Sequence, residues 1–259
     1  MSTEVQNLNQ FISITDPGEK NQDNHLFGDR LMISVSNVVA WIFPLLIVAI
    51  VTQVIIRKAG FNQAWLDDAQ WWMYGFAMLT GFGYAITTES HVRVDILHQN
   101  YSPKRKARIE VFAHGWLLLP FLALMTDILM HYAFASIKAS EGSDSPNGLH
   151  MLYILKTSLP ILFLLAIIAS WTVLCRHLKI LGKTFLYLKI IASLPFLWFV
   201  AERFVFYALW WFIRLSNPDL NHRNIARDPM VSHTVEMGLG LLIILFIVSY
   251  LRTQKLLKG

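Results

Sequence analysis

Six long apolar runs constrain the fold of this chain more than any other feature of its sequence. They cover residues 31–56, 69–88, 111–135, 149–175, 190–213 and 231–251. A helix of about 20 predominantly apolar residues is long enough to cross the hydrocarbon core of a bilayer. With 55% hydrophobic and only 15% charged residues, the chain belongs to the membrane class by composition. The sequence therefore predicts an all-α integral membrane protein with six spans, of which the run at 190–213 is the least certain to cross fully.

The connection between the second and third runs, Glu89–Arg108, carries the densest basic cluster in the chain. The cluster consists of Arg93, Lys104, Arg105, Lys106 and Arg108. Short loops rich in Lys and Arg stay on the cytoplasmic side of a membrane. When both termini are placed on that side as well, the inner segments hold roughly twice as many basic residues as the outer loops. The charge distribution thus predicts a multi-pass topology with the N- and C-termini in the cytoplasm.

The net charge of +5 is consistent with two kinds of anionic binding partner, nucleic acid and lipid headgroups. The basic residues lie mainly at the ends of apolar runs, where anionic lipid headgroups are found. Membrane lipids are therefore expected partners, and nucleic acid is not.

Residues 1–30 are polar and contain the turn-forming triplet Asp16-Pro17-Gly18, so we expect a cytoplasmic tail that does not fold by itself and is not a cleaved signal peptide.

Polar residues at the start of the charged connection form the first candidate site. His91, Arg93 and Asp95 alternate with apolar residues, so an extended segment would place all three on one face, and a helix would pair His91 with Asp95. We favour a structural role, in which they form a charged helix end or fix the loop, over a chemical one. The next two candidates, Ser102 and Pro103, read as an N-cap followed by proline at the first position of a helix.

Ionisable residues inside the apolar runs are the second group of candidates, because such residues are expensive in a bilayer and face protein or water. Asp127 and His131 are spaced to share one helix face, either as a satisfied polar pair, which we favour, or as a proton-handling pair. Lys156 is expected to extend outward to the membrane surface; the alternative is a contact with a docked binding protein or a partner's carboxylate.

Glu202 and Arg203 lie near the middle of the fifth run. Adjacent residues diverge by about 100° around a helix, so we expect that they cannot face each other as a simple pair. Our interpretation is that each bonds to another helix or to a partner subunit. The alternative is a tilted helix that brings them near an interface or a water-filled crevice.

Four segments in a fixed order resemble a known family. An uncharged run is followed by HVRVDIL, then SPKRKAR opens the next run, and a loop with SPNGL precedes LYILKTSLP. This order, over about residues 31–175, resembles the small, DctQ-like permease subunit of tripartite ATP-independent periplasmic (TRAP) transporters. The resemblance implies a four-helix core, assigned here to residues 31–183, in the bacterial inner membrane. The two further spans expected in residues 184–259 depart from the usual four-helix pattern of that family.

The same resemblance implies a division of labour between polypeptides. A large, DctM-like permease would carry the moving domain and the sodium and substrate sites, and a periplasmic binding protein would deliver an organic acid. This chain would then be a scaffold without cofactor, metal, catalytic or substrate-binding residues. Lys104, Arg105, Lys106, Arg108, Asp127, His131, Lys156, Glu202 and Arg203 are its candidate contacts to the partner subunit or to lipid headgroups.

Two other functions compete with this interpretation. A small b-type haem or redox subunit needs histidine ligands on facing helices, but His114 and His131 fall in the same predicted span. A channel or carrier that acts alone needs a ring or chain of polar groups across the membrane, which the few interior polar residues do not form. The sequence contains none of the motifs GxxxxGK[ST], HExxH or GxSxG, so we expect no enzymatic activity.

Overall fold

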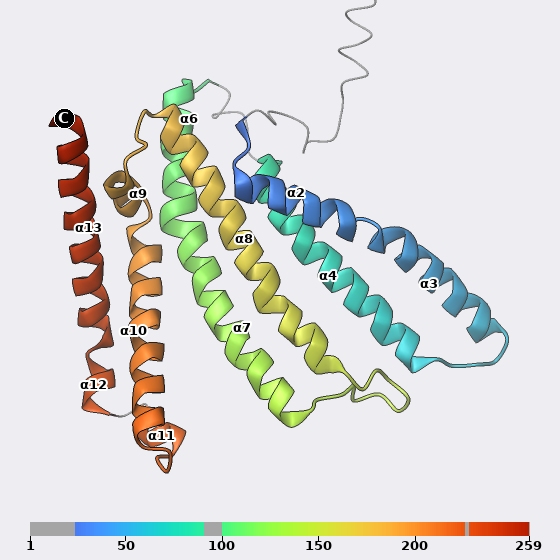
Figure 1. Cartoon of the computed structure of the whole chain (residues 1–259). Helices are drawn as coiled ribbons and strands as arrows, with labels where there is room; N and C mark the ends of the chain where they lie inside the picture. The colour runs from blue at the N-terminus through green and yellow to red at the C-terminus, as the bar shows by residue number, and fades with distance from the viewer. Residues whose placement is uncertain (1–23, 91–99, 226–227, 259) are drawn as a thin grey trace, which may run out of the picture. The chain divides into compact units, whose positions relative to one another are not determined.

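The computed structural model describes residues 24–90, 100–225 and 228–258, and all the regular structure in these ranges is helical (Figure 1). The predicted fold class, an all-α membrane protein, is confirmed. Five helical stretches in the described ranges are long and apolar enough to cross a membrane: Phe27–Lys58, Pro103–Ala139, Leu152–Ile180, Leu194–Ser216 and Thr234–Leu257.

Contacts divide the chain into two compact units. The first contains the described residues up to 90 together with 125–176, and the second contains 100–124 together with 177–258. This grouping differs from the division at residues 30 and 183 expected from the sequence, which stays a prediction. The two units are described separately below.

The first unit begins with α2 (Phe27–Val39) and α3 (Ile42–Lys58). Two turn residues, Ala40 and Trp41, separate them. Pro44 explains the interruption, because it has no N–H to donate to the carbonyl of Ala40 and its ring would clash with that carbonyl in a continuous helix. The first helix therefore starts at Phe27, four residues earlier than the predicted span, and changes course where the proline requires it.

Helix α4 (Ala64–Thr88) corresponds to the second predicted span. Its 25 residues are long enough to cross a bilayer, yet its Trp, Tyr, Gly and Thr residues make it less apolar than the five stretches above. It packs against α2 closely, since a Cβ added to Gly83 would lie 2.7 Å from Cε of Met32. The helix ends at Glu89, which adopts the left-handed conformation (φ 54°).

The remaining core helices are longer than the runs that predicted them. α6 (Pro103–Phe112), the π-helix η2 (Ala113–Leu118) and α7 (Leu119–Ala139) follow one another without a break. α8 (Leu152–Ile180) contains Pro160. Residues Met125 onward of α7 and residues up to Arg176 of α8 belong to the first unit.

The second unit contains the C-terminal extension. Its helices are α9 (Leu186–Ala192), α10 (Leu194–Ser216), α11 (His222–Ile225), α12 (Pro229–Ser232) and α13 (Thr234–Lys258). The predicted fifth run, 190–213, is split: α9 ends at Ala192, Ser193 separates the two helices, and Pro195 sits in the first turn of α10. α10 and α13 lie side by side along their length (Figure 1). A small apolar cluster of Ile213, Ile225 and Val231 closes the end where the chain turns from one to the other.

Candidate functional site

A buried polar cluster ties together three helix ends of the first unit. The guanidinium of Arg176, near the end of α8, donates to the carbonyl oxygen of Thr87 (2.8 Å) and to Oε1 of Glu89 (3.1 Å). Its Nε lies 3.9 Å from Oδ2 of Asp29, an ion-pair distance, and Asp29 is fully buried. Oδ1 of Asp29 accepts a hydrogen bond from the Thr172 hydroxyl (3.0 Å). The start of α2 and the ends of α4 and α8 therefore meet at one end of the unit.

A second polar cluster lies at the start of α4. Asp67 accepts hydrogen bonds from Arg57 (2.8 Å) and from the side chain of Gln53, both on α3. The adjacent Asp68 accepts from the backbone N–H of Leu149 (3.0 Å), in the loop before α8. This cluster joins the end of α3 and the start of α4 to the loop between α7 and α8.

The spacing of the two clusters matches a bilayer. Asp68 and Thr88 lie about 30 Å apart along α4 at 1.5 Å per residue, which is the thickness of the hydrocarbon core. No charged residue lies between them in the sequence. α4 thus has an uncharged middle and anchored polar ends, the arrangement expected of a crossing helix.

Lys156 is engaged inside its own chain. Its ammonium donates to Oε1 of Glu141 (2.5 Å) in the loop after α7 and lies 4.2 Å from the centre of the Tyr132 ring. The residue is only 9% exposed, and its side chain reaches the loop at the end of α7; that it extends to the membrane surface stays a prediction. The hydrogen bond from Lys156 lowers the pKa of Glu141 below its usual range. The alternative reading placed a partner's carboxylate or a docked binding protein against Lys156, whereas here a carboxylate in a loop of this chain bonds to it.

Glu202 and Arg203 form a bidentate pair, which corrects the prediction that neighbours on a helix cannot face each other. Nε and Nη2 of Arg203 lie 2.5 and 2.7 Å from the two carboxylate oxygens of Glu202. The backbone positions of the two residues are about 100° apart around the helix, but the arginine side chain is long enough to reach the carboxylate of its neighbour. Oε1 of Glu202 also accepts a hydrogen bond from the Thr234 hydroxyl (3.0 Å) at the start of α13. The predicted bond from Glu202 to another helix is therefore present.

Gly238 makes this contact between α10 and α13 possible. A Cβ at this position would lie 2.7 Å from Cα and 2.8 Å from N of Glu202, closer than any ordinary contact. The pair also borders an open groove of about 670 Å³ in the second unit, whose walls are otherwise mostly aromatic and aliphatic. The groove is lined by Pro120, Phe121, Leu124, Pro195, Trp198, Phe199, Glu202, Arg203 and Val235.

Asp127 and His131 both lie on α7, as predicted. Asp127 is half-buried and His131 is exposed. His114, the other histidine considered as a haem ligand, is buried in η2 with Nε2 3.7 Å from a carboxylate oxygen of Glu110. Within the described ranges no group of three His, Cys, Asp or Glu side chains is placed to hold a metal ion. The haem alternative gains no support from these positions.

The start of α6 has the predicted form. Ser102 is the N-cap and accepts a weak hydrogen bond from the backbone N–H of Arg105 (3.4 Å), and Pro103 occupies the first turn. Lys104, Arg105 and Arg108 are exposed and Lys106 is half-buried. The other part of the motif, His91, Arg93 and Asp95, lies outside the residues that the structure describes.

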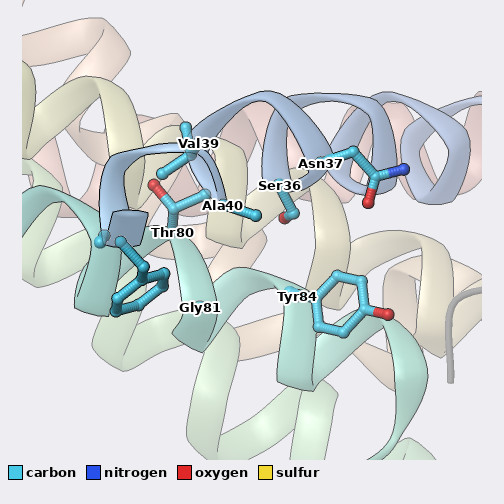
Figure 2. Close-up of a pocket in the computed structure, with 9 residues that line it drawn as sticks. Ser36, Asn37, Val39, Ala40, Thr80, Gly81 and Tyr84 are labelled. Carbon is cyan, nitrogen blue, oxygen red and sulfur yellow. The ribbon is translucent and has the colours of Figure 1, made fainter. Parts of the chain in front are cut away.

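An open groove between α2 and α4 is the clearest candidate for an interaction site in the first unit (Figure 2). It has a volume of about 240 Å³ and no ionisable wall apart from one tyrosine. Figure 2 shows Ser36 on α2 and Ala40 in the turn after it, above Thr80, Gly81 and Tyr84 on α4. The lining residues are Ser36, Asn37, Val39, Ala40, Phe43, Ala77, Thr80, Gly81 and Tyr84.

Two polar side chains in this groove distinguish it from an ordinary lipid-facing surface. The hydroxyl oxygen of Ser36 is buried, and the described residues offer it no hydrogen-bond partner. Asn37 is exposed on the same turn. An exposed amide is costly against lipid and a strong hydrogen-bonding group against another helix. The opposite wall presents Gly81, where an added Cβ would meet no atom within 4 Å. Small residues of this kind allow a second helix to approach closely.

The fold and these surfaces define a helical, multi-pass membrane protein with polar anchors at both ends of its first unit and grooves suited to helix packing. The comparison with protein families identifies one family within the class of helical, multi-pass membrane proteins. Residues 46–180, slightly more than half of the chain, match the family described as "Tripartite ATP-independent periplasmic transporters, DctQ component", and the chain belongs to that family. No curated protein and no solved structure matches it.

Sequence reasoning missed most of the residues that build these sites. Asp29 and Glu89 are separated from Arg176 by most of the core, and nothing in their local sequence shows that they converge. Ser36 and Asn37 lie in a run read only as a span, although an amide inside an apolar run is itself a signal of a helix contact. Gly238 could not be distinguished from Gly240 without the position of Glu202.

Proposed function

We propose that this chain is the non-catalytic small subunit of a TRAP-type secondary transporter, and that it holds a large permease in place in the bacterial inner membrane. In this proposal the large permease imports an organic acid, a carboxylate, together with sodium, after delivery by a periplasmic binding protein. The small subunit binds no cofactor, and the sodium sites belong to the large subunit. The family membership supports this assignment.

The topology in this proposal has six spans, with α4 included, and both termini in the cytoplasm. The cluster of Asp29, Glu89 and Arg176 then marks the cytoplasmic end of the first unit, and the cluster around Asp67 and Asp68 marks the periplasmic end. The basic residues that follow Pro103 support this orientation, because short loops rich in Lys and Arg stay inside.

The observation that carries the proposal is the bare surface of the first helical stretch. Only 11% of the most apolar window of Phe27–Lys58 is buried within the chain, compared with 44% for Leu152–Ile180. A stretch that faced lipid alone would not place the amide of Asn37 and the buried hydroxyl of Ser36 in a groove whose opposite wall includes Gly81. We infer that a transmembrane helix of the large permease occupies this groove and forms hydrogen bonds with Ser36 and Asn37.

Other occupants fit the groove less well. Its only ionisable wall is a tyrosine, so it offers no charge to recognise an organic acid. The groove is open to its surroundings, whereas sites for small molecules are concave and enclose most of their ligand. A helix fills such a groove through close packing of small residues and a few interhelical hydrogen bonds.

Gly81→Leu tests the groove, and Gly75→Leu is its matched control. Both glycines lie on α4, both are exposed, and an added Cβ meets no atom within 4 Å at either position. Only Gly81 lines the groove, so Gly81→Leu fills it without a clash inside the chain. The tagged full chain is purified in a mild detergent from its own membranes, and the co-purifying proteins are identified and quantified by mass spectrometry.

We expect the wild type and Gly75→Leu to retain a larger multi-span membrane protein at a constant ratio. Gly81→Leu and Asn37→Leu should lose it at least tenfold. If the wild type retains such a partner and both groove variants do so equally, the groove is not the docking site but the proposed function stands. If the wild type retains no multi-span partner, the proposed function itself fails.

A further inference from the structure

A third groove, also in the second unit and separate from the one beside Glu202 and Arg203, combines apolar walls with two basic residues. It has a volume of about 240 Å³ and lies among the start of the helix from Pro103, the end of α8, and α9. Arg108 and Lys183 are its basic residues, and no acidic residue lines it. The other lining residues are Val111, Phe112, Trp116, Leu178, Leu181, Leu188, Ile191 and Ala192.

Near this groove, the first turn of α6 carries basic residues, which the helix dipole disfavours at that end of a helix. Helix α6 has no acidic residue in its first turn, and Lys104, Arg105 and Lys106 stand there instead. Cations are unfavourable at a helix N-terminus, where the helix dipole is positive. Arg105 stacks on the ring of Tyr101 at 3.9 Å, whereas Arg108 borders the groove. An anion outside the chain would relieve this concentration of positive charge.

The walls of the groove suit an amphiphile better than a water-soluble anion. Phe112 and Trp116 are stacked, with ring centroids 6.2 Å apart and planes 20° apart. Trp116 is 43% exposed, and tryptophan concentrates at the level of the lipid headgroups. Leu188 and Ile191, from α9, line the same groove. A free phosphate would leave this apolar surface uncovered, whereas an acyl chain would cover it.

We propose that this groove binds an anionic phospholipid of the cytoplasmic leaflet. Its phosphate lies between Arg108 and Lys183, and one acyl chain runs along Phe112, Trp116 and Ile191. Phosphate is held by charge-assisted hydrogen bonds from arginine and lysine, and each basic residue near an anionic headgroup strengthens binding about fivefold. The lipid would fill the groove between α6, α8 and α9, and so stabilise the second unit.

Native mass spectrometry of the delipidated full chain tests this proposal directly. The protein is titrated with dioleoyl phosphatidylglycerol and, in parallel, with dioleoyl phosphatidylcholine. The variant Arg108→Gln/Lys183→Gln removes both cations of the groove. The variant Arg252→Gln/Lys255→Gln removes two exposed basic residues of α13 that do not line it, and therefore controls for the change in net charge.

We expect the wild type to bind phosphatidylglycerol at least tenfold more tightly than phosphatidylcholine. The groove variant should lose about 25-fold in affinity for phosphatidylglycerol, at fivefold per charge, while the control loses less than twofold. A second variant, Ala192→Phe, fills the groove with all charges kept and should weaken both lipids. Equal losses in the groove variant and the charge control, or an unaltered affinity in both groove variants, would overturn the proposal.

Discussion

Gly238→Ala is expected to separate α10 from α13 and to destabilise the second unit. The added Cβ would lie 2.7 Å from Cα and 2.8 Å from N of Glu202. These are backbone atoms, so no side-chain rotation can relieve the clash. Carbon atoms pack at about 3.5–4.0 Å, and the two helices must therefore move apart by about 1 Å at this point.

The magnitude follows from three contributions. Overpacking of this kind costs about 1–3 kcal/mol. The hydrogen bond from Thr234 to Glu202 (3.0 Å) would be stretched, and such bonds in membrane proteins contribute about 0.6 kcal/mol. Alanine is the better helix former by about 0.8–1.0 kcal/mol, which offsets part of the loss. The net expected destabilisation is about 1–2 kcal/mol.

The assay is unfolding of the full chain in mixed micelles by titration with sodium dodecyl sulfate, followed by circular dichroism. Gly240→Ala is the matched control, because an added Cβ at Gly240 meets no atom within 4 Å. That control should be as stable as the wild type or slightly more stable. If Gly238→Ala and Gly240→Ala unfolded at the same detergent fraction, the close contact between α10 and α13 would be refuted.

Two further substitutions address the polar clusters of the first unit. Arg176→Gln should destabilise that unit by about 3 kcal/mol, because it removes the charge that faces the fully buried Asp29 and leaves a buried carboxylate without an ion-pair partner. The same detergent titration measures the loss, and Arg252→Gln, at an exposed position, is its control. Glu141→Gln should abolish a pH dependence of stability. The hydrogen bond from Lys156 lowers the pKa of Glu141 below its ordinary value of 4.5, so the stabilisation by this pair is complete above that ordinary value and is lost as the pH falls below it and through the lowered pKa. Wild-type stability that did not fall more steeply than that of Glu141→Gln below this ordinary pKa would contradict the role of the ion pair.

The elements of this fold were largely readable from the sequence, because their signals are local. Apolar runs predicted the positions of the long helices, and Ser102 followed by Pro103 predicted the start of α6. Boundaries were less accurate where a proline interrupts an apolar run. The run at 31–56 was expected to be one helix, but a turn just before Pro44 divides it into α2 and α3. Similarly, the run at 190–213 is divided between α9 and α10 just before Pro195.

The sites were harder to predict because they depend on which helices meet. The prediction that Glu202 and Arg203 cannot pair considered only the angle between their backbone positions. It was wrong because the arginine side chain is long enough to reach the neighbouring carboxylate. For Lys156 the sequence placed the residue near the membrane surface but could not show that Glu141 lies opposite. The groove with Ser36 and Asn37 arises from the packing of α2 on α4, which no local pattern encodes.

The most direct test of the central claim is the composition of the complex that this chain forms in its own membrane. Tagged wild-type chain, extracted in a mild detergent and measured by native mass spectrometry, should appear bound to one larger multi-span permease at a fixed ratio. Reconstitution in liposomes should then give sodium-dependent uptake only when both polypeptides and the binding protein are present. A chain that appears alone, or that transports substrate without any partner, would contradict the assignment as a scaffolding subunit.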